Sequence, residues 1–160
     1  MTIRARCLIL SCGNTLRSDD GIGPFLSKWA RERYAADARI AVITRHQWTP
    51  DLAEDLSAAQ TALFIDCSVE AAPGEVRLCP VEPAAPQAGL ATHHSGASQL
   101  LHMARQLYGS LPRRSLLLTI GAGSVELGEE FSPAVRAALP EARKRLEEAV
   151  ASLLDPANCL

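Results

Sequence analysis

The sequence predicts an α/β fold, a three-layer sandwich in which a mostly parallel, twisted sheet of about five strands lies between helices. Three observations support this prediction. Apolar runs of strand length alternate along the chain with segments of helical periodicity. The apolar runs are nearly continuous, as in strands that are covered on both faces. The chain has 160 residues, which is the size of one domain.

Five segments have the character of strands. The first, RCLILSC, ends at a glycine turn, and ALFIDCS carries an aspartate among its last residues. A Pro-Gly turn introduces the fourth segment, and a glycine turn follows the fifth. In chain order they span residues 6–12, 39–45, 62–68, 75–81 and 114–120.

Four segments have helical spacing of apolar residues, and they fall between or after the strands. We expect Thr49, Ser95 and Ser132 to cap three of them, and Gly109 to end the third. Pro140 lies inside the last segment and is expected to kink or restart that helix. The four segments span residues 22–35, 49–59, 95–109 and 132–155.

The amino-acid composition limits the kinds of binding partner and the cellular compartment that we expect for this protein. The net charge is −2, so no overall basic surface favours nucleic acid or an anionic membrane. No apolar run reaches the roughly 20 residues that a membrane span needs. The five cysteines are odd in number and form no C-x-x-C pair, and no signal peptide is recognisable. These features favour a reducing, cytoplasmic location.

Reactive side chains follow the predicted strands. Asp19 and Asp20 lie in the turn GNTLRSDDGIG after the first strand, Asp66 lies at the end of the third, and His93 and His94 lie in the loop ATHHSG. Ligands bind beyond the carboxyl ends of the strands in open α/β sheets. We therefore expect these side chains at one edge of the sheet.

Carboxylates with an imidazole are a plausible open site for a divalent metal, whereas two aspartates would repel a phosphate. Taken singly, each feature has a plainer explanation. The acidic pair could be a solvated turn, Asp66 could cap a loop, and the histidines could be a surface pair. Their convergence on one edge favours a functional site.

Other residues are weaker candidates for the functional site. Cys12 and Cys67 also fall at strand ends, and we interpret them as small packing residues. His102 lies on a predicted helix and is expected to be structural. His46 could face the same crevice, and Trp48 beside it could belong to the core or wall a substrate site.

The motifs GNTLRSDDGIG, FIDCS followed by PGEVR, THHSG and LGEEFSP together resemble the hydrogenase maturation proteases. The resemblance covers nearly the whole chain and implies one domain of this family over residues 1–160. It implies an endopeptidase that removes a C-terminal peptide from the large-subunit precursor of a nickel–iron hydrogenase. That cleavage follows nickel delivery to the precursor, and the resemblance implies a transient complex between the two proteins.

By motif position, the resemblance implies that Asp20, Asp66 and His93 contact nickel and serve catalysis. The nickel is that of the substrate, and other divalent metals are expected to occupy the same site in vitro. Two segments depart from the family pattern. TRHQWTP replaces a Gly-Gly-Ser/Thr segment after the second strand, and TIGAGS replaces an Ile-Glu/Gln-Pro segment after the last.

Two mechanisms and two other functions stay open at this stage. The metal could activate the scissile carbonyl or water, with Asp19 as a general base, or Asp20 and Asp66 could share a proton as an aspartic dyad. A receiver-like phospho-acceptor domain also has an acidic pair after its first strand, but no lysine follows the last strand here. A metal- or nucleotide-binding module is the other alternative, and the chain lacks G-x-G-x-x-G.

Overall fold

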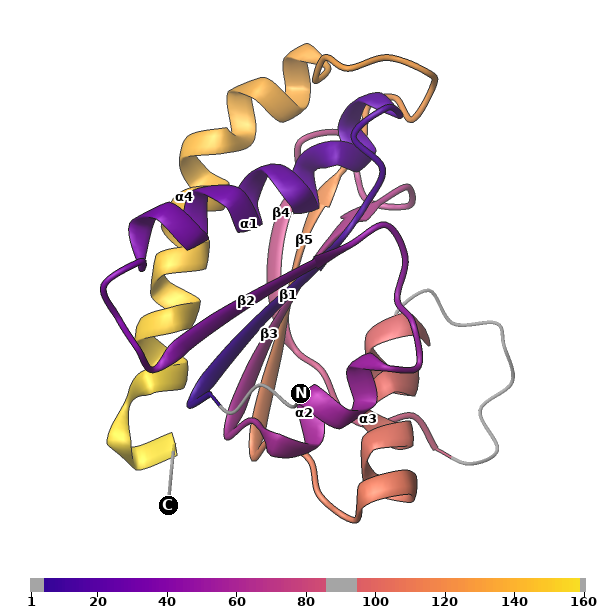
Figure 1. The fold of residues 1–160 in the computed structure, drawn as a ribbon. Helices are drawn as coiled ribbons and strands as arrows, with labels where there is room; N and C mark the ends of the chain where they lie inside the picture. Colours follow the sequence, from indigo (N-terminus) through magenta and orange to yellow (C-terminus); the bar gives the residue numbers. More distant parts are fainter. Residues whose placement is uncertain (1–4, 86–94, 159–160) are drawn as a thin grey trace.

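The computed structural model describes residues 5–85 and 95–158. Five strands form one sheet in the order β2-β1-β3-β5-β4 (Figure 1). The pairs β1·β2, β1·β3 and β3·β5 are parallel, and β4 pairs antiparallel with β5 at one edge. The strands are β1 (Cys7–Cys12), β2 (Ile40–Arg45), β3 (Thr61–Ser68), β4 (Val76–Pro80) and β5 (Arg114–Gly121).

Helices cover both faces of this sheet, as the sequence predicts (Figure 1). One face carries α1 (Ile22–Arg33) and the long α4 (Pro133–Leu154). The other carries α2 (Leu52–Ala58) and α3 (Ser95–Tyr108). Among the described residues, no helix combines the length and the apolar character of a membrane span. The predicted three-layer α/β architecture is confirmed.

Two hydrophobic cores lie on opposite sides of the sheet because side chains alternate along each strand. In β1, Cys7 and Ile9 pack toward α1 and α4, whereas Leu8 and Leu10 pack toward α2 and α3. All four are fully buried. Burial of one such leucine contributes about 1.5–3 kcal/mol relative to exposure. A strand that is buried on both faces therefore needs an uninterrupted apolar run.

The predicted helix ends are correct at two of the helices. Ser132 caps α4, where its hydroxyl accepts from the Val135 amide at 3.4 Å. The backbone of Gly109 has φ 68°, and its amide donates to the Arg105 carbonyl directly after α3. This left-handed conformation suits glycine and ends the helix. The side chain of Ser95, the predicted cap of α3, lies outside the described residues.

One predicted helix cap is wrong, and one of two alternatives predicted for another helix is excluded. Thr49 does not cap α2, which begins at Leu52 after a turn in which the Leu52 amide donates to the Thr49 carbonyl. The prediction failed because a Thr-Pro pair suits such a turn as well as a helix start. Of the kink or restart expected at Pro140, the restart does not occur, because α4 continues through Pro140 from Pro133 to Leu154. Packing of the buried face of α4 against the sheet outweighs the loss of one backbone hydrogen bond.

Candidate active site

A glycine-bracketed turn joins β1 to α1 and carries the acidic pair in a short 3-10 helix, η1 (Ser18–Gly21). A Cβ atom at Gly13 would overlap the Asp20 carbonyl oxygen, and one at Gly23 would overlap the Cys12 carbonyl oxygen. The two glycines therefore allow the backbone of the turn and of α1 to lie directly against the end of β1. They serve close packing of the chain on itself and do not form a phosphate cradle.

Replacing Gly23 by alanine is expected to lower the free energy of unfolding by about 3 kcal/mol, because backbone must move to admit the new methyl group. Urea denaturation measures the loss. Gly109→Ala is the matched control, since nothing lies within 4 Å of a Cβ there and only its φ of 68° opposes the change. That control should lose about 1 kcal/mol. Equal losses in the two variants would contradict the packing argument.

Asp19 is fully buried, and hydrogen bonds surround its carboxylate. The Ser132 amide donates to Oδ1 at 2.7 Å. The Ser132 hydroxyl and the Gly123 amide each donate to Oδ2 at 2.7 Å, and the Ser124 amide donates at 3.0 Å. Burial alone would raise the pKa of Asp19, but these bonds outweigh it and the pKa is lowered.

The expected role of Asp19 as a general base is therefore corrected. A general base must reach the proton that it abstracts. The side chain of Asp19 is closed off from the surface, and donors from another part of the chain bind both its oxygens. Asp19 joins the turn after β1 to the loop after β5 and to the start of α4.

Asp20 differs from its neighbour because it is only partly buried. Its Oδ2 accepts from the Asn14 amide at 2.7 Å, which closes the turn around the carboxylate. The charge of Asp20 raises the pKa of Asp66 and of the thiols of Cys12 and Cys67. Asp20 and Asp66 thus interact at the carboxyl edge of the sheet, although 46 positions separate them in sequence (66 − 20).

Asp66 lies two residues before the end of β3, and its Oδ1 accepts from the Cys67 amide at 2.8 Å. Burial raises the pKa of Asp66, and the negative charge of Asp20 raises it further. Bonds from the Cys67 amide and the Cys12 thiol, together with the Trp48 indole, act in the opposite direction without cancelling the rise. A cation between the two carboxylates would relieve their repulsion.

The two cysteines beside Asp66 are protonated thiols at neutral pH. Burial raises the pKa of Cys12, as do the charges of Asp66 and Asp20. Burial likewise raises the pKa of Cys67 to about 12. Because the thiolate is the form that attacks carbonyls, neither thiol is activated as a nucleophile. The interpretation of both as packing residues agrees with the contact of Cys67 with the α1 and α4 core.

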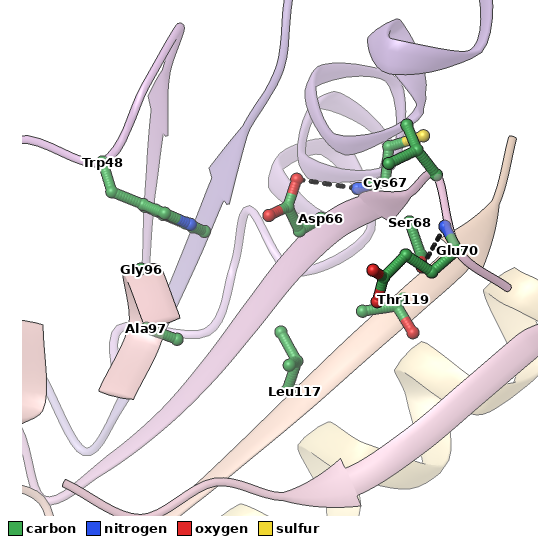
Figure 2. Close-up of a pocket in the computed structure, with 10 residues that line it drawn as sticks. Trp48, Asp66, Cys67, Ser68, Glu70, Gly96, Ala97, Leu117 and Thr119 are labelled. Atoms are coloured by element: carbon green, nitrogen blue, oxygen red, sulfur yellow. Dashed lines mark hydrogen bonds between the residues drawn. The ribbon is translucent and has the colours of Figure 1, made fainter. Parts of the chain in front are cut away.

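A cleft of about 290 Å³ opens beside Asp66, between β3, β5 and the start of α3. Figure 2 shows Trp48 and Asp66 along it, with Leu117 and Thr119 contributed by β5. Ser68 and Glu70 add polar groups where β3 ends. The cleft is therefore lined by the partly buried carboxylate of Asp66, by apolar side chains and by polar side chains.

Trp48 takes both of the roles that its sequence position allows, because it lines this cleft and also packs against the core beneath α2 and α3. Its indole packs edge-to-face on Phe64, with ring centroids 5.6 Å apart, and against Gly96 at the start of α3. Figure 2 shows the indole directed toward Asp66. His46 instead lies exposed at a neighbouring cavity of about 270 Å³ with Thr15 and Arg45.

The structure brings together two of the three residues predicted to contact metal. Asp20 and Asp66 interact as described, whereas His93 and His94 lie outside the described residues. Within residues 5–85 and 95–158, no group of three or more His, Cys, Asp or Glu side chains is arranged to hold a metal ion. A metal at this edge would need ligands beyond the two aspartates. The assignment of Asp20, Asp66 and His93 as the site stays a prediction.

Sequence reasoning missed the polar partners that hold this edge together. Asn14 closes the turn around Asp20. Gly123 and Ser124, which belong to the TIGAGS segment that departs from the family pattern, bind Asp19. Ser132 was predicted only as a helix cap, but its hydroxyl also donates to Asp19. Residue spacing carries no signal for contacts across more than 100 positions, so only the folded chain reveals them.

Solved structures with this fold come from bacteria and archaea. The hydrogenase maturating endopeptidase HybD from E. coli matches with a TM-score of 0.74 and 22% identity, covering 92% of this chain and 93% of that one. The hydrogenase 2 maturation peptidase from Thaumarchaeota archaeon SCGC_AB-539-E09 matches with a TM-score of 0.66 and 25% identity, covering 91% and 97%. The [NiFe] hydrogenase maturation protease HybD from Thermococcus kodakarensis matches with a TM-score of 0.63 and 23% identity, covering 90% and 98%.

No protein-family model matches the sequence, and no curated protein does. The similarity is therefore detected in three dimensions, over nearly the full length of both partners in each comparison. It agrees with the resemblance found in the motifs around Asp20 and Asp66. The chain has the fold of the hydrogenase maturation endopeptidases.

Proposed function

We propose that this chain is an endopeptidase that removes a C-terminal peptide from the nickel-loaded large-subunit precursor of a [NiFe] hydrogenase. The observation that carries the proposal is the interaction of Asp20 with Asp66 beside a cleft of about 290 Å³. This pair occurs in a chain that shares its fold with named hydrogenase maturation peptidases. The precursor is a transient partner, and the reaction takes place in the cytoplasm.

In this proposal the nickel belongs to the substrate. Asp20, Asp66 and His93 contact it once the precursor docks, and the metal supplies Lewis acidity at the scissile carbonyl or at the attacking water. The two aspartates supply negative charge, Asp20 from η1 and Asp66 from near the end of β3. The bond from the Asn14 amide holds Asp20, and the bond from the Cys67 amide holds Asp66. The cleft beside Asp66 accommodates the polypeptide on one side of the cleavage point.

An aspartic dyad is the other chemical route for the same reaction. It requires two carboxylates that share one proton at close range. The raised pKa of Asp66 is compatible with that route, but its largest cause is burial and the charge of Asp20 contributes less. The metal-assisted route better explains why the charge of Asp20, in η1, acts on Asp66 near the end of β3. A cation bound by both carboxylates would relieve the repulsion between them.

Two functions from other classes have less support. A receiver-like domain needs an accessible acidic pair and a lysine near the end of its last parallel strand, whereas Asp19 is buried and fully bonded. Lys28 lies in α1 and Lys144 lies well inside α4, so neither lysine directly follows the end of β5. A nucleotide-binding module would need backbone groups free to bind phosphate. The glycines of the turn are instead packed against Cys12 and Asp20.

A cleavage assay tests the proposal. Purified chain is mixed with nickel-loaded and with nickel-free large-subunit precursor, and release of the C-terminal peptide is followed by mass spectrometry. We expect release from the nickel-loaded form to be at least about 100-fold faster, because metal ligands contribute more than the 10–100-fold typical of outer-shell groups. Equal cleavage of both forms would favour the aspartic dyad. Absence of cleavage by folded protein would contradict the peptidase assignment.

A further inference from the structure

The two aspartates of the turn differ in the side chains and backbone that they contact. Asp20 is partly buried and bound to the Asn14 amide within its own turn. Asp19 is fully buried, and its carboxylate takes all four of its hydrogen bonds from Gly123, Ser124 and Ser132. Of these two adjacent residues, Asp20 therefore lies at the candidate site, whereas Asp19 contacts a loop that is distant in sequence.

The attachment of Asp19 involves backbone as well as side chain. Its amide donates to the Ser124 carbonyl at 3.0 Å. One residue earlier, the Ser18 amide donates to the Gly128 carbonyl at 2.7 Å, and the Ser18 hydroxyl donates to the Glu126 carbonyl at 2.8 Å. The turn before Asp20 is therefore joined along its length to the loop between β5 and α4.

This attachment also accounts for an unfavourable backbone conformation. Ser18 has φ 51°, a left-handed conformation that non-glycine residues rarely adopt. Such a conformation persists only where surrounding contacts hold it in place. The bonds of Ser18 and Asp19 to the 123–132 loop supply those contacts. Without them the turn could relax, and the Asp20 carboxylate would move with it.

We infer that Asp19 is a positioning residue, which sets the place of the Asp20 carboxylate by anchoring η1 to the loop after β5 and to the start of α4. This inference rests on the proposed function for its catalytic meaning, but its structural content stands independently. Ser132 is the second member of the anchor, because its hydroxyl donates to Asp19 and accepts from Val135 in α4. Asp19 touches neither substrate nor metal in this scheme.

Hydrogen exchange at the Asn14 amide tests the anchor without any assumption about activity. That amide donates to the Asp20 Oδ2, so its protection reports whether the carboxylate is in place. In Asp19→Asn we expect Asn14 to exchange at least tenfold faster relative to the amides of β1 and β3. Ser132→Ala keeps three of the four bonds to Asp19 and should give a smaller increase of the same kind.

Leu153→Ala is the matched control for lost stability, because Leu153 is fully buried at the far end of α4. It should raise exchange throughout the chain without singling out Asn14. The cleavage assay then adds a functional readout at a temperature where every variant is folded. There Asp19→Asn and Ser132→Ala should lower kcat at least tenfold with less effect on KM, while Leu153→Ala retains the wild-type values.

The outcomes separate the anchor from the peptidase assignment. Selective loss of Asn14 protection supports positioning even if wild-type chain cleaves no precursor, in which case only the proposed function fails. Should Asp19→Asn not fold, the comparison of Ser132→Ala with Leu153→Ala decides. Two results would overturn the inference. One is that the Asn14 amide exchanges no faster relative to the core amides in either Asp19→Asn or Ser132→Ala. The other is that both variants fold and keep the wild-type kcat.

Discussion

Asp20→Asn is expected to reduce cleavage of the nickel-loaded precursor by at least about 100-fold, since a ligand matters more than the outer-shell groups that contribute 10–100-fold. The amide side chain removes the negative charge that faces Asp66 and would contact the metal. It keeps an oxygen that can accept from the Asn14 amide. The free energy of unfolding should therefore change by no more than about 1 kcal/mol.

Rates of peptide release and urea denaturation together check this expectation. Glu126→Gln is the matched control, because Glu126 is an exposed carboxylate on the loop that adjoins the same turn. It should leave cleavage unchanged and alter the stability by less than about 0.5 kcal/mol. If Asp20→Asn cleaves at the wild-type rate, Asp20 is not part of the site. If instead it unfolds, its carboxylate has a structural role that the hydrogen bonds do not indicate.

Asp19→Asn is expected to lower the free energy of unfolding by about 3 kcal/mol. The substitution turns a carboxylate that accepts four hydrogen bonds into an amide with one accepting oxygen. Its NH₂ group would then face donors, which leaves buried polar groups unpaired. Urea denaturation measures the loss, and Glu141→Gln on the exposed side of α4 serves as the control with a change below about 0.5 kcal/mol.

At acidic pH, the difference in the free energy of unfolding between wild type and Asp19→Asn should become smaller. The folded-state pKa of Asp19 is lowered, so its ionised form stabilises the fold. That contribution is complete above the unfolded-state pKa of about 3.9 and is lost as the pH falls through the lower folded-state pKa. Denaturation at pH 7, 5 and 3 should show an equal difference at the first two values and a smaller one at the third. A difference that does not depend on pH would contradict this account of the carboxylate.

These two predictions revise the expectation that Asp19 serves as a general base. In the sequence, two adjacent aspartates in a turn look equivalent except by motif position, which favoured Asp20 as the metal contact. Because Asp19 is buried among four donors and Asp20 is only partly buried, we expect the loss of Asp19 to affect stability first and the loss of Asp20 to affect activity. The pair combines an internal anchor with a carboxylate at the candidate site.

The sequence by itself determined the layered α/β fold. Apolar runs such as CLILSC have the length and continuity of strands buried on both faces, and local periodicity is enough to recognise them. It also placed Asp20 and Asp66 at one edge, because parallel strands end on the same side of a sheet. The Ser132 cap was predictable because a helix start depends on neighbouring residues.

Only the tertiary structure decided how the edge is assembled. Asp19 finds its donors more than 100 positions away, and no local pattern encodes a bond of that separation. Trp48 becomes a wall of the cleft because α3 offers Gly96 at the point of contact and β3 offers Phe64. The raised pKa values of Asp66 and Cys67 arise from burial, which exists only in the folded chain. Patterns along the chain specify elements and their ends, whereas contacts between distant loops depend on how those elements pack.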